Sequence, residues 1–268
     1  MRPVTLITGA SSGIGADLAR VFAAHGHELV LVARRERELE ALADEIAAAG
    51  GPRPVVLVLD LGRRDAVARI AAELAARELE PANVVNNAGF GLTGAAAFLD
   101  RDEQLAMIDL NVRALTELSL AFTESLAGHR GGILNVASIA GLLPGPYMAV
   151  YYASKAYVIS FSEALHQELK PRGVRVTALC PGPVATGFQA RAGIRAGGTG
   201  ERSLMALPAR RVAEIGYAGF IRGKRLVIAG IGNKIAMFFA RLVPHALLLP
   251  IVADRMRQAQ AGREAEKL

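Results

Sequence analysis

Short apolar runs recur along the chain, and most of them lead into a loop and then a segment with helical spacing. The first run, Val4–Thr8, is followed by the glycine loop GASSGIG and by apolar residues at Ile14, Leu18 and Val21. The predicted strands are Val4–Thr8, Glu28–Ala33, Val55–Asp60, Asn83–Gly89, Gly132–Ser138 and Arg175–Gly182, with a last one near Lys224–Gly230. Helices are predicted near residues 36–49, 65–80, 102–127 and 151–170.

Strands that are apolar throughout and alternate with helices are typical of a parallel sheet covered on both faces. Right-handed crossovers make such a sheet doubly wound. The sequence therefore predicts a Rossmann-like α/β fold, in which ligands bind at the carboxyl ends of the strands. With 268 residues, 52% of them apolar, the chain is expected to form one domain.

The net charge of +6 and the pI of 9.8 raise the question of a nucleic-acid or membrane partner. Arginines are scattered along the chain, aromatic residues make up 5%, and there is no Trp. This distribution favours a solvated basic surface over a nucleic-acid interface.

The histidines and the lone Cys180 suggest neither a metal site nor a disulfide. No two His have metal-ligand spacing, and one cysteine cannot form an intramolecular bridge. The first residues enter an apolar strand with no signal-peptide pattern, so the reducing cytosol is the expected compartment.

The glycine loop after the first strand is suited to a dinucleotide. Gly9 allows a tight turn, Gly13 a close approach of backbone to pyrophosphate, and Gly15 close packing of the helix. The helix N-terminus adds free N–H groups and a partial positive charge. The spacing is G-x-x-x-G-x-G, which differs from the commoner G-x-G-x-x-G.

The end of the second strand indicates which dinucleotide is bound. An acidic residue there would bind the ribose hydroxyls of NAD, but the chain has Ala33 followed by Arg34 and Arg35. Arginines favour the 2′-phosphate of NADP, so NADP(H) is predicted. Arg34 is the preferred ligand, and Arg35 is open to being a solvated charge at a helix start.

Tyr151 and Lys155 in VYYASK share a helix face, whereas Tyr152 points elsewhere. A phenol of pKa ~10 is a poor acid–base catalyst at neutral pH, but a neighbouring ammonium lowers that pKa. The pair by itself is suggestive only, because chance placement gives such a spacing in roughly one chain in ten and the alternative is an exposed Tyr–Lys pair.

Five motifs occur together: TGASSGIG, NNAG, the serine of NVASIAG, YYASK and CPGPVAT. Their order and spacing resemble those of the short-chain dehydrogenase/reductase family over roughly residues 1–190. The resemblance implies that Tyr151 is the general acid/base, that Ser138 polarises the substrate oxygen, and that Lys155 holds the nicotinamide ribose. It also implies that Asn111, or the helix kink on which it lies, holds a water in a proton relay to Lys155.

The resemblance implies a set of cofactor contacts along the strand ends. They comprise the glycine loop, the two arginines, residues by the adenine and ribose, residues by the nicotinamide, and the Tyr–Lys pair. The expected residues are Gly9, Ser11, Ser12, Gly13, Ile14, Gly15, Arg34, Arg35, Asp60, Leu61, Asn87, Gly89, Tyr151, Lys155, Pro181, Gly182, Val184 and Thr186. Cys180 is expected to be a core residue, because nothing nearby would activate its thiol.

The chain past the motifs is harder to interpret. Residues 1–230 are expected to form the catalytic domain, with a mobile lid at 187–207, and 231–268 a helical extension on the same domain. The apolar run Ile235–Ala253 contains Arg241, His245 and two prolines, which argues against a membrane span. It is interpreted first as a cover for an apolar substrate pocket, next as a subunit contact, and last as an element resting on a membrane.

Other functional classes stay open. An epimerase or dehydratase would be expected to have a G-x-x-G-x-x-G loop and a longer substrate domain. A non-catalytic protein that senses NADP(H) or binds a partner is the other alternative. Family members commonly pair the helices after the fourth and fifth strands, which implies a homodimer or homotetramer.

Overall fold

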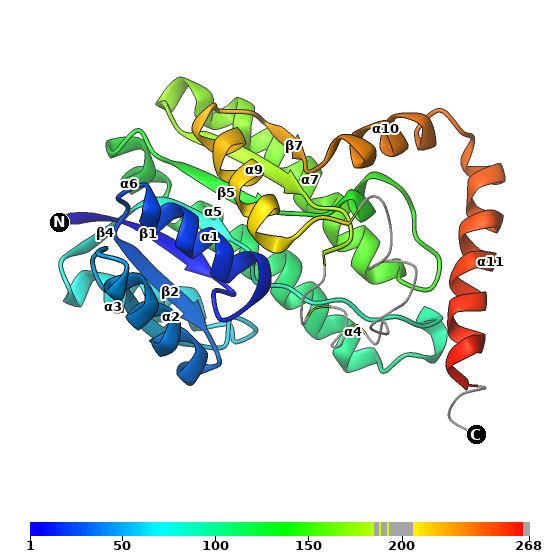
Figure 1. Cartoon of the computed structure of the whole chain (residues 1–268), viewed down its shortest axis with the longest axis horizontal. Coiled ribbons are helices and arrows are strands. Elements are labelled where there is room, and N and C mark those ends of the chain that lie inside the picture. Colours follow the sequence, from blue (N-terminus) through cyan, green and yellow to red (C-terminus); the bar gives the residue numbers. More distant parts are fainter. Residues whose placement is uncertain (185–187, 189–191, 193–205, 265–268) are drawn as a thin grey trace.

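The computed structural model describes residues 1–184, 188, 192 and 206–264 (Figure 1). Seven parallel strands form one sheet in the order β3-β2-β1-β4-β5-β6-β7. They are β1 Arg2–Thr8, β2 Leu29–Ala33, β3 Val55–Val58, β4 Leu79–Asn86, β5 Gly132–Val136, β6 Arg175–Cys180 and β7 Leu226–Ile228. The Rossmann-like doubly wound sheet predicted from the sequence is confirmed.

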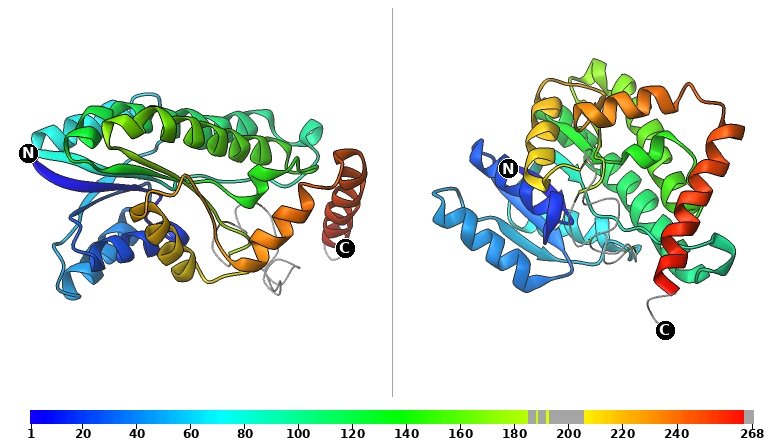
Figure 2. Two further views of the ribbon diagram at one scale, coloured as in Figure 1. Left: turned by 90° about the horizontal axis from the view of Figure 1, so that it is seen from above. Right: turned by 45° about the vertical axis from the view of Figure 1, so that its right-hand side comes forward.

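Helices cover both faces of the sheet, which explains why β2 and β5 are buried at every residue (Figure 2). One core is built with α1 Gly13–Ala24, α2 Glu36–Ala48 and α9 Ala209–Ile221. The other is built with α3 Ala66–Ala76, α5 Leu115–Ala121, α6 Thr123–Gly128 and α7 Ala149–Leu169. The remaining short elements before β6 are α4 Arg101–Ile108 and the turns η1 Ala96–Phe98, η2 Asp109–Ala114, η3 Ile139–Leu142 and η4 Lys170–Arg172.

The strand order reverses between β1 and β4. The chain moves outward from β1 to β3 and then returns to place β4 on the other side of β1. The loops after β1 and β4 therefore leave in different directions, and a crevice for a ligand lies between them.

Two predicted helices differ in their extent. The segment 102–127 is broken into α4, the π-helical η2, α5 and α6, and its hydroxyls at Thr116 and Ser119 bond to helix carbonyls one turn back, which bends a helix. The helix predicted over 65–80 ends at Ala76, because Glu78 has a φ of 55° and Leu79 begins β4.

Two helices follow β7: α10 Ile231–Ala240 and α11 His245–Glu264. Pro244 separates them, and α11 lies at the end of the molecule away from the sheet (Figure 1). Among the described residues, no helix has the length and apolar character needed to cross a bilayer.

Candidate active site

A cleft of ≈ 900 Å³ opens at the carboxyl ends of the strands. Most of the residues predicted from the sequence line it: Gly9, Ser11, Ser12, Gly13, Ile14, Arg34, Arg35, Asp60, Leu61, Asn87, Gly89, Ser138, Tyr151, Lys155, Pro181, Gly182 and Val184. Gly15 and Asn111 are not part of the lining. Thr186 and most of the predicted lid lie outside the described residues.

The glycine loop packs against Asn87, which follows β4. The Asn87 side-chain amide donates to the carbonyls of Thr8 (3.0 Å) and Gly9 (3.1 Å). A Cβ on Gly9, whose φ is +64°, would lie 2.8 Å from the Asn87 Nδ2, and a Cβ on Gly15 would clash with that same atom. Glycine is therefore required at both positions. Gly15 does not line the cleft itself, but it allows the glycine loop and Asn87 to pack closely behind it.

The two arginines after β2 make different contacts. Arg35 donates to the hydroxyl of Ser11 at 3.0 Å and of Ser12 at 2.7 Å, so its guanidinium lies across the glycine loop. Arg34 is half exposed, with its Nη1 3.9 Å from a carboxylate oxygen of Asp60. Both residues line the cleft.

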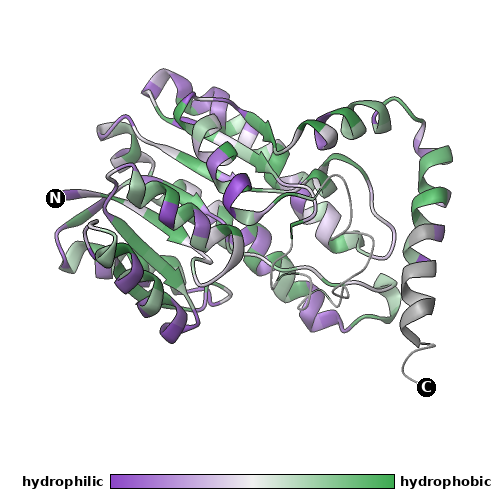
Figure 3. Ribbon diagram, in the orientation of Figure 1, coloured by the Kyte–Doolittle hydropathy of each residue, from purple (hydrophilic) through white to green (hydrophobic). Residues whose placement is uncertain are grey.

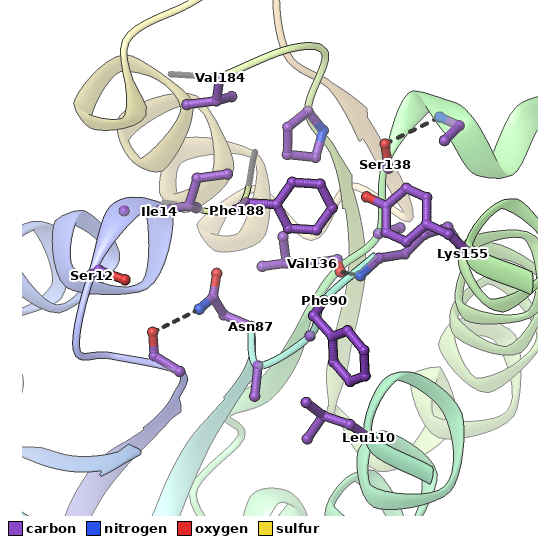
Figure 4. Close-up of a pocket in the computed structure, with 18 of the residues that line it drawn as sticks. Ser12, Ile14, Asn87, Phe90, Leu110, Val136, Ser138, Lys155, Val184 and Phe188 are labelled. Atoms are coloured by element: carbon purple, nitrogen blue, oxygen red, sulfur yellow. Dashed lines mark hydrogen bonds between the residues drawn. The ribbon is translucent and has the colours of Figure 1, made fainter. Parts of the chain in front are cut away.

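The other end of the cleft gathers Ser138, Tyr151 and Lys155. Ser138 follows β5 and accepts a hydrogen bond from the Ala140 N–H at 3.1 Å. Tyr151 and Lys155 are both buried on α7, and the Lys155 Nζ is 5.9 Å from the centre of the Tyr151 ring. Figure 4 shows Ser138 and Lys155 on one side of the pocket and Asn87 on the other.

Burial sets the acid–base properties of this pair. It raises the pKa of Tyr151 to about 12, although the hydrogen bond with the Ser138 side chain acts in the opposite direction. It lowers the pKa of Lys155 to about 8, because the ammonium is removed from water. In the protein alone, burial therefore outweighs the lowering of the tyrosine pKa that was expected from the lysine.

Lys155 is held in place by a backbone carbonyl. Its Nζ donates to the Val136 oxygen at 2.9 Å, at the end of β5 (Figure 4). A Cβ on Gly89 would lie 3.5 Å from the same Nζ and 2.8 Å from the Asn111 Oδ1. The missing side chain at Gly89 leaves room for Asn111 and the ammonium to pack beside it. Gly89 and Lys155 both line the cleft, and we call this part of the cleft the cradle.

Asn111 lies behind the cleft and is completely buried on the π-helical turn η2. Its side chain accepts from the Phe90 N–H at 3.1 Å and donates to the Phe90 carbonyl at 2.9 Å and the Ser154 hydroxyl at 3.1 Å. Through these contacts Asn111 holds the loop after β4 in position, and it lies on the π-helical turn η2, where a helix kink was expected.

The residues fit a dinucleotide. The start of α1 offers backbone N–H groups, the two arginines offer charge, and the cradle beside Gly89 leads to Lys155 and Ser138. Gly182 also needs to lack a side chain, since a Cβ there would clash with Asn233 of α10.

Sequence reasoning gave an apolar cover as the first interpretation of the C-terminal segment but named none of the residues at the apolar end of the cleft. This part is lined by Phe90, Leu143, Met148, Tyr152, Phe188, Met237 and Met256. Phe188 packs on Tyr151 with ring centres 5.4 Å apart, and Met256 joins the cluster of Phe90 and Met148. Scattered aromatic and methionine residues have no chemical signature in the sequence, so the residues of this wall could be identified only in three dimensions.

Cys180 is fully buried in β6, and burial raises the pKa of its thiol to about 12. The thiol is therefore a core group rather than a nucleophile. Within the described part of the chain, no group of three or more His, Cys, Asp or Glu is placed to hold a metal ion.

Residues 3–195 match the family model of the short chain dehydrogenase. The chain is 41% identical over 192 residues to a sulfoacetaldehyde reductase of Chromohalobacter salexigens, covering 70% of this chain and 75% of that one. It is similar in structure to a short-chain dehydrogenase from Sphingobium yanoikuyae in complex with NADPH, with 33% identity, a TM-score of 0.78, and 90% and 94% coverage.

A second structure shows that the fold is seen with either dinucleotide. A short chain dehydrogenase/reductase from Burkholderia phymatum in complex with NAD has 26% identity, a TM-score of 0.77, and 88% and 92% coverage. The family model stops before α9, so α10 and α11 lie outside that match. The chain belongs to the short-chain dehydrogenase/reductase family of oxidoreductases, which use NAD(P)(H).

Proposed function

We propose that the protein interconverts a carbonyl and a secondary alcohol on an apolar substrate, with NADP(H) as cofactor. One observation carries this proposal: Ser138, Tyr151 and Lys155 meet at one end of a cleft whose other end is the glycine loop with its arginines. A non-catalytic NADP(H)-binding protein would have no need for these three groups together.

The residues divide the chemistry among them. The nicotinamide, when bound, supplies or accepts the hydride. Ser138 and Tyr151 hydrogen-bond the substrate oxygen, and Tyr151, protonated at neutral pH, gives that oxygen its proton during reduction. Lys155 positions the cofactor ribose from the cradle beside Gly89 and places a positive charge near the phenol. Asn111 keeps the backbone of that cradle in position.

The preference for NADP(H) rests on Arg34 and Arg35 at the end of β2. Arg34→Ala is expected to weaken NADPH binding about 10- to 100-fold and NADH binding little, because only NADPH has the 2′-phosphate. Arg35→Ala removes the hydrogen bonds to Ser11 and Ser12 that hold the glycine loop. It should therefore weaken the binding of both dinucleotides.

Dissociation constants measured by NADPH and NADH fluorescence test this difference. Arg37→Ala, an exposed arginine further along α2, is the matched control and should change neither value. If Arg34→Ala weakened the binding of NADPH and NADH equally, Arg34 would have no role in recognising the 2′-phosphate.

The apolar lining sets the substrate class. Phe90, Met148 and Phe188 surround the reacting end, and Met237 and Met256 extend the apolar wall from the two C-terminal helices. Such a lining favours bulky apolar ketones, aldehydes, quinones or steroid-like carbonyls over small charged ones.

The test is oxidation of NADPH by the purified chain with carbonyl compounds of increasing apolar size. We expect kcat/KM to rise with the apolar size of the substrate, by about tenfold for each one or two methylene groups added. If NADPH binds and none of these carbonyls is reduced, the protein is a cofactor-binding module and the catalytic proposal fails.

We further propose a homodimer or homotetramer in the cytosol. Exposed apolar side chains on α4, α5 and α7 support helix pairing between subunits: Leu105, Ile108, Leu120 and Tyr157. Residues 1–230 would form the catalytic domain, and the helices after it an extension on the same domain.

A further inference from the structure

The two C-terminal helices expose far more apolar surface than the cleft requires. Met237 and Met256 face the cleft, but other residues of the two helices and of the turn between them are exposed to solvent. We call these the C-terminal apolar face: Ile231, Ile235, Phe238, Phe239, Leu242, Leu247 and Ile251. In Figure 3, α10 and the first turns of α11 are predominantly hydrophobic.

The spacing of these residues makes a continuous stripe. Ile231, Ile235 and Phe238 follow one another at intervals of four and three residues, so they lie on one side of α10. Leu242, four residues after Phe238, lies in the turn that follows the helix. Phe238 and Leu242 are 63% and 66% exposed. Contiguous exposed apolar surface of this kind marks an interaction site.

The charges on α10 and on the turn after it have one sign, and the next acidic residue, Asp254 of α11, pairs with Arg257 at 3.5 Å. From Ile231 to Ala253 the chain contains no Asp or Glu, and its ionisable side chains are Lys234, Arg241 and His245. Lys234 and Arg241 are exposed and seven residues apart, so they line one border of the stripe. An apolar face bordered by cations is complementary to an anionic lipid surface.

A second copy of the chain is a poorer partner for this face. A twofold contact would bring the Lys234 and Arg241 of both copies together, with no acidic residue of the segment to compensate. We propose that the C-terminal apolar face docks the protein onto an anionic lipid bilayer.

The structure holds the face in a fixed position for this role. Asn233 on the inner side of α10 donates to the Ala229 carbonyl at 2.7 Å. Arg257 of α11 donates to the Tyr147 hydroxyl at 2.9 Å, and Met256 packs against the cleft cluster. The same two helices therefore wall the apolar end of the cleft and face outward, which would place the cleft beside the membrane.

Flotation of the full chain with lipid vesicles tests the proposal. Binding to phosphatidylcholine vesicles containing phosphatidylserine is expected to exceed binding to pure phosphatidylcholine by at least about tenfold and to fall as salt rises. The proposal is independent of turnover, so failure of the enzymatic assay leaves this readout intact.

Two double variants separate the contributions. Phe238→Ser with Leu242→Ser should reduce binding to the anionic vesicles at least about tenfold, while Ile221→Ser, an exposed apolar residue on α9, should not. Lys234→Glu with Arg241→Glu should reduce it similarly, whereas the equal charge change of Arg222→Glu with Lys224→Glu should have a smaller effect.

Several results would overturn the proposal. They are no flotation of the unaltered chain, equal binding to both kinds of vesicle, or unchanged binding by the Phe238/Leu242 variant. Analytical ultracentrifugation provides a further test. If the unaltered chain does not float and the Phe238/Leu242 variant loses self-association, the face contacts a second copy of the chain. NADPH binding by each variant confirms that it is folded.

Discussion

Tyr151→Phe is expected to lower kcat for carbonyl reduction by about 10³-fold, because the substrate oxygen loses its proton donor. Burial raises the pKa of Tyr151 to about 12, so the phenol carries its proton throughout the neutral range. The ring contact with Phe188 survives in the variant, and NADPH affinity should stay within about threefold of the original.

Tyr152→Phe is the matched control for this change. Tyr152 is the next residue of α7, also lines the cleft and has a pKa raised by burial, but it is not four residues from Lys155. Its kcat should change by a few-fold at most, about the effect of losing one ordinary hydrogen bond. If the two variants turned over at similar rates, Tyr151 would not be the proton donor and the mechanism would need another acid.

The strands were predictable because burial on both faces leaves a strong sequence signal. Runs such as those at β2 and β5 contain no charged residue. Such uncharged runs are typical of strands in a parallel sheet that helices cover on both faces. Gly9, Tyr151 and Lys155 were predictable for a different reason. Their chemistry depends on spacing within one loop or one helix turn, which the sequence displays directly.

The features that helical periodicity and position do not indicate depend on contacts between distant segments. The π-helical turn at Asn111 is stabilised by bonds to Phe90, a residue in another loop, so only the family resemblance implied a kink there. The contact of Arg35 with Ser11 and Ser12 likewise depends on how close β2 brings two loops. Position along the chain alone favours Arg34 as the ligand of the 2′-phosphate.

The C-terminal helices show the same limit. The sequence allows three interpretations of this segment, which stand as alternatives to one another. The structure divides the segment by helix face: Met237 lines the cleft, while Phe238 points to solvent, one residue further along. Covering the pocket and docking on a membrane are therefore compatible roles of one element.

Lys155→Met is expected to abolish most turnover and yet to stabilise the fold. The variant loses the charge beside Tyr151 and the donor in the cradle at Gly89, so kcat should fall by at least about 10²-fold. Burial lowers the pKa of Lys155 from 10.5 to about 8, which corresponds to a cost of about 3 kcal/mol when the amine is charged. Methionine removes this cost but leaves the Val136 carbonyl without its donor, at about 1–3 kcal/mol.

The pH dependence of stability distinguishes this charge cost from a packing effect. The unfolded lysine holds its proton up to about pH 10.5, and the folded one loses it near pH 8, so in this window the unfolded state binds more protons. The stability contribution of Lys155 must then rise with pH between those values, and the full cost applies below pH 8. We expect the free energy of unfolding of Lys155→Met to exceed that of the unaltered chain by up to about 2 kcal/mol at pH 7. That advantage should disappear towards pH 10 in urea titrations. A variant that is less stable by the same amount at both pH values would show that the lysine stabilises the fold through its contacts, and that its burial carries no charge cost.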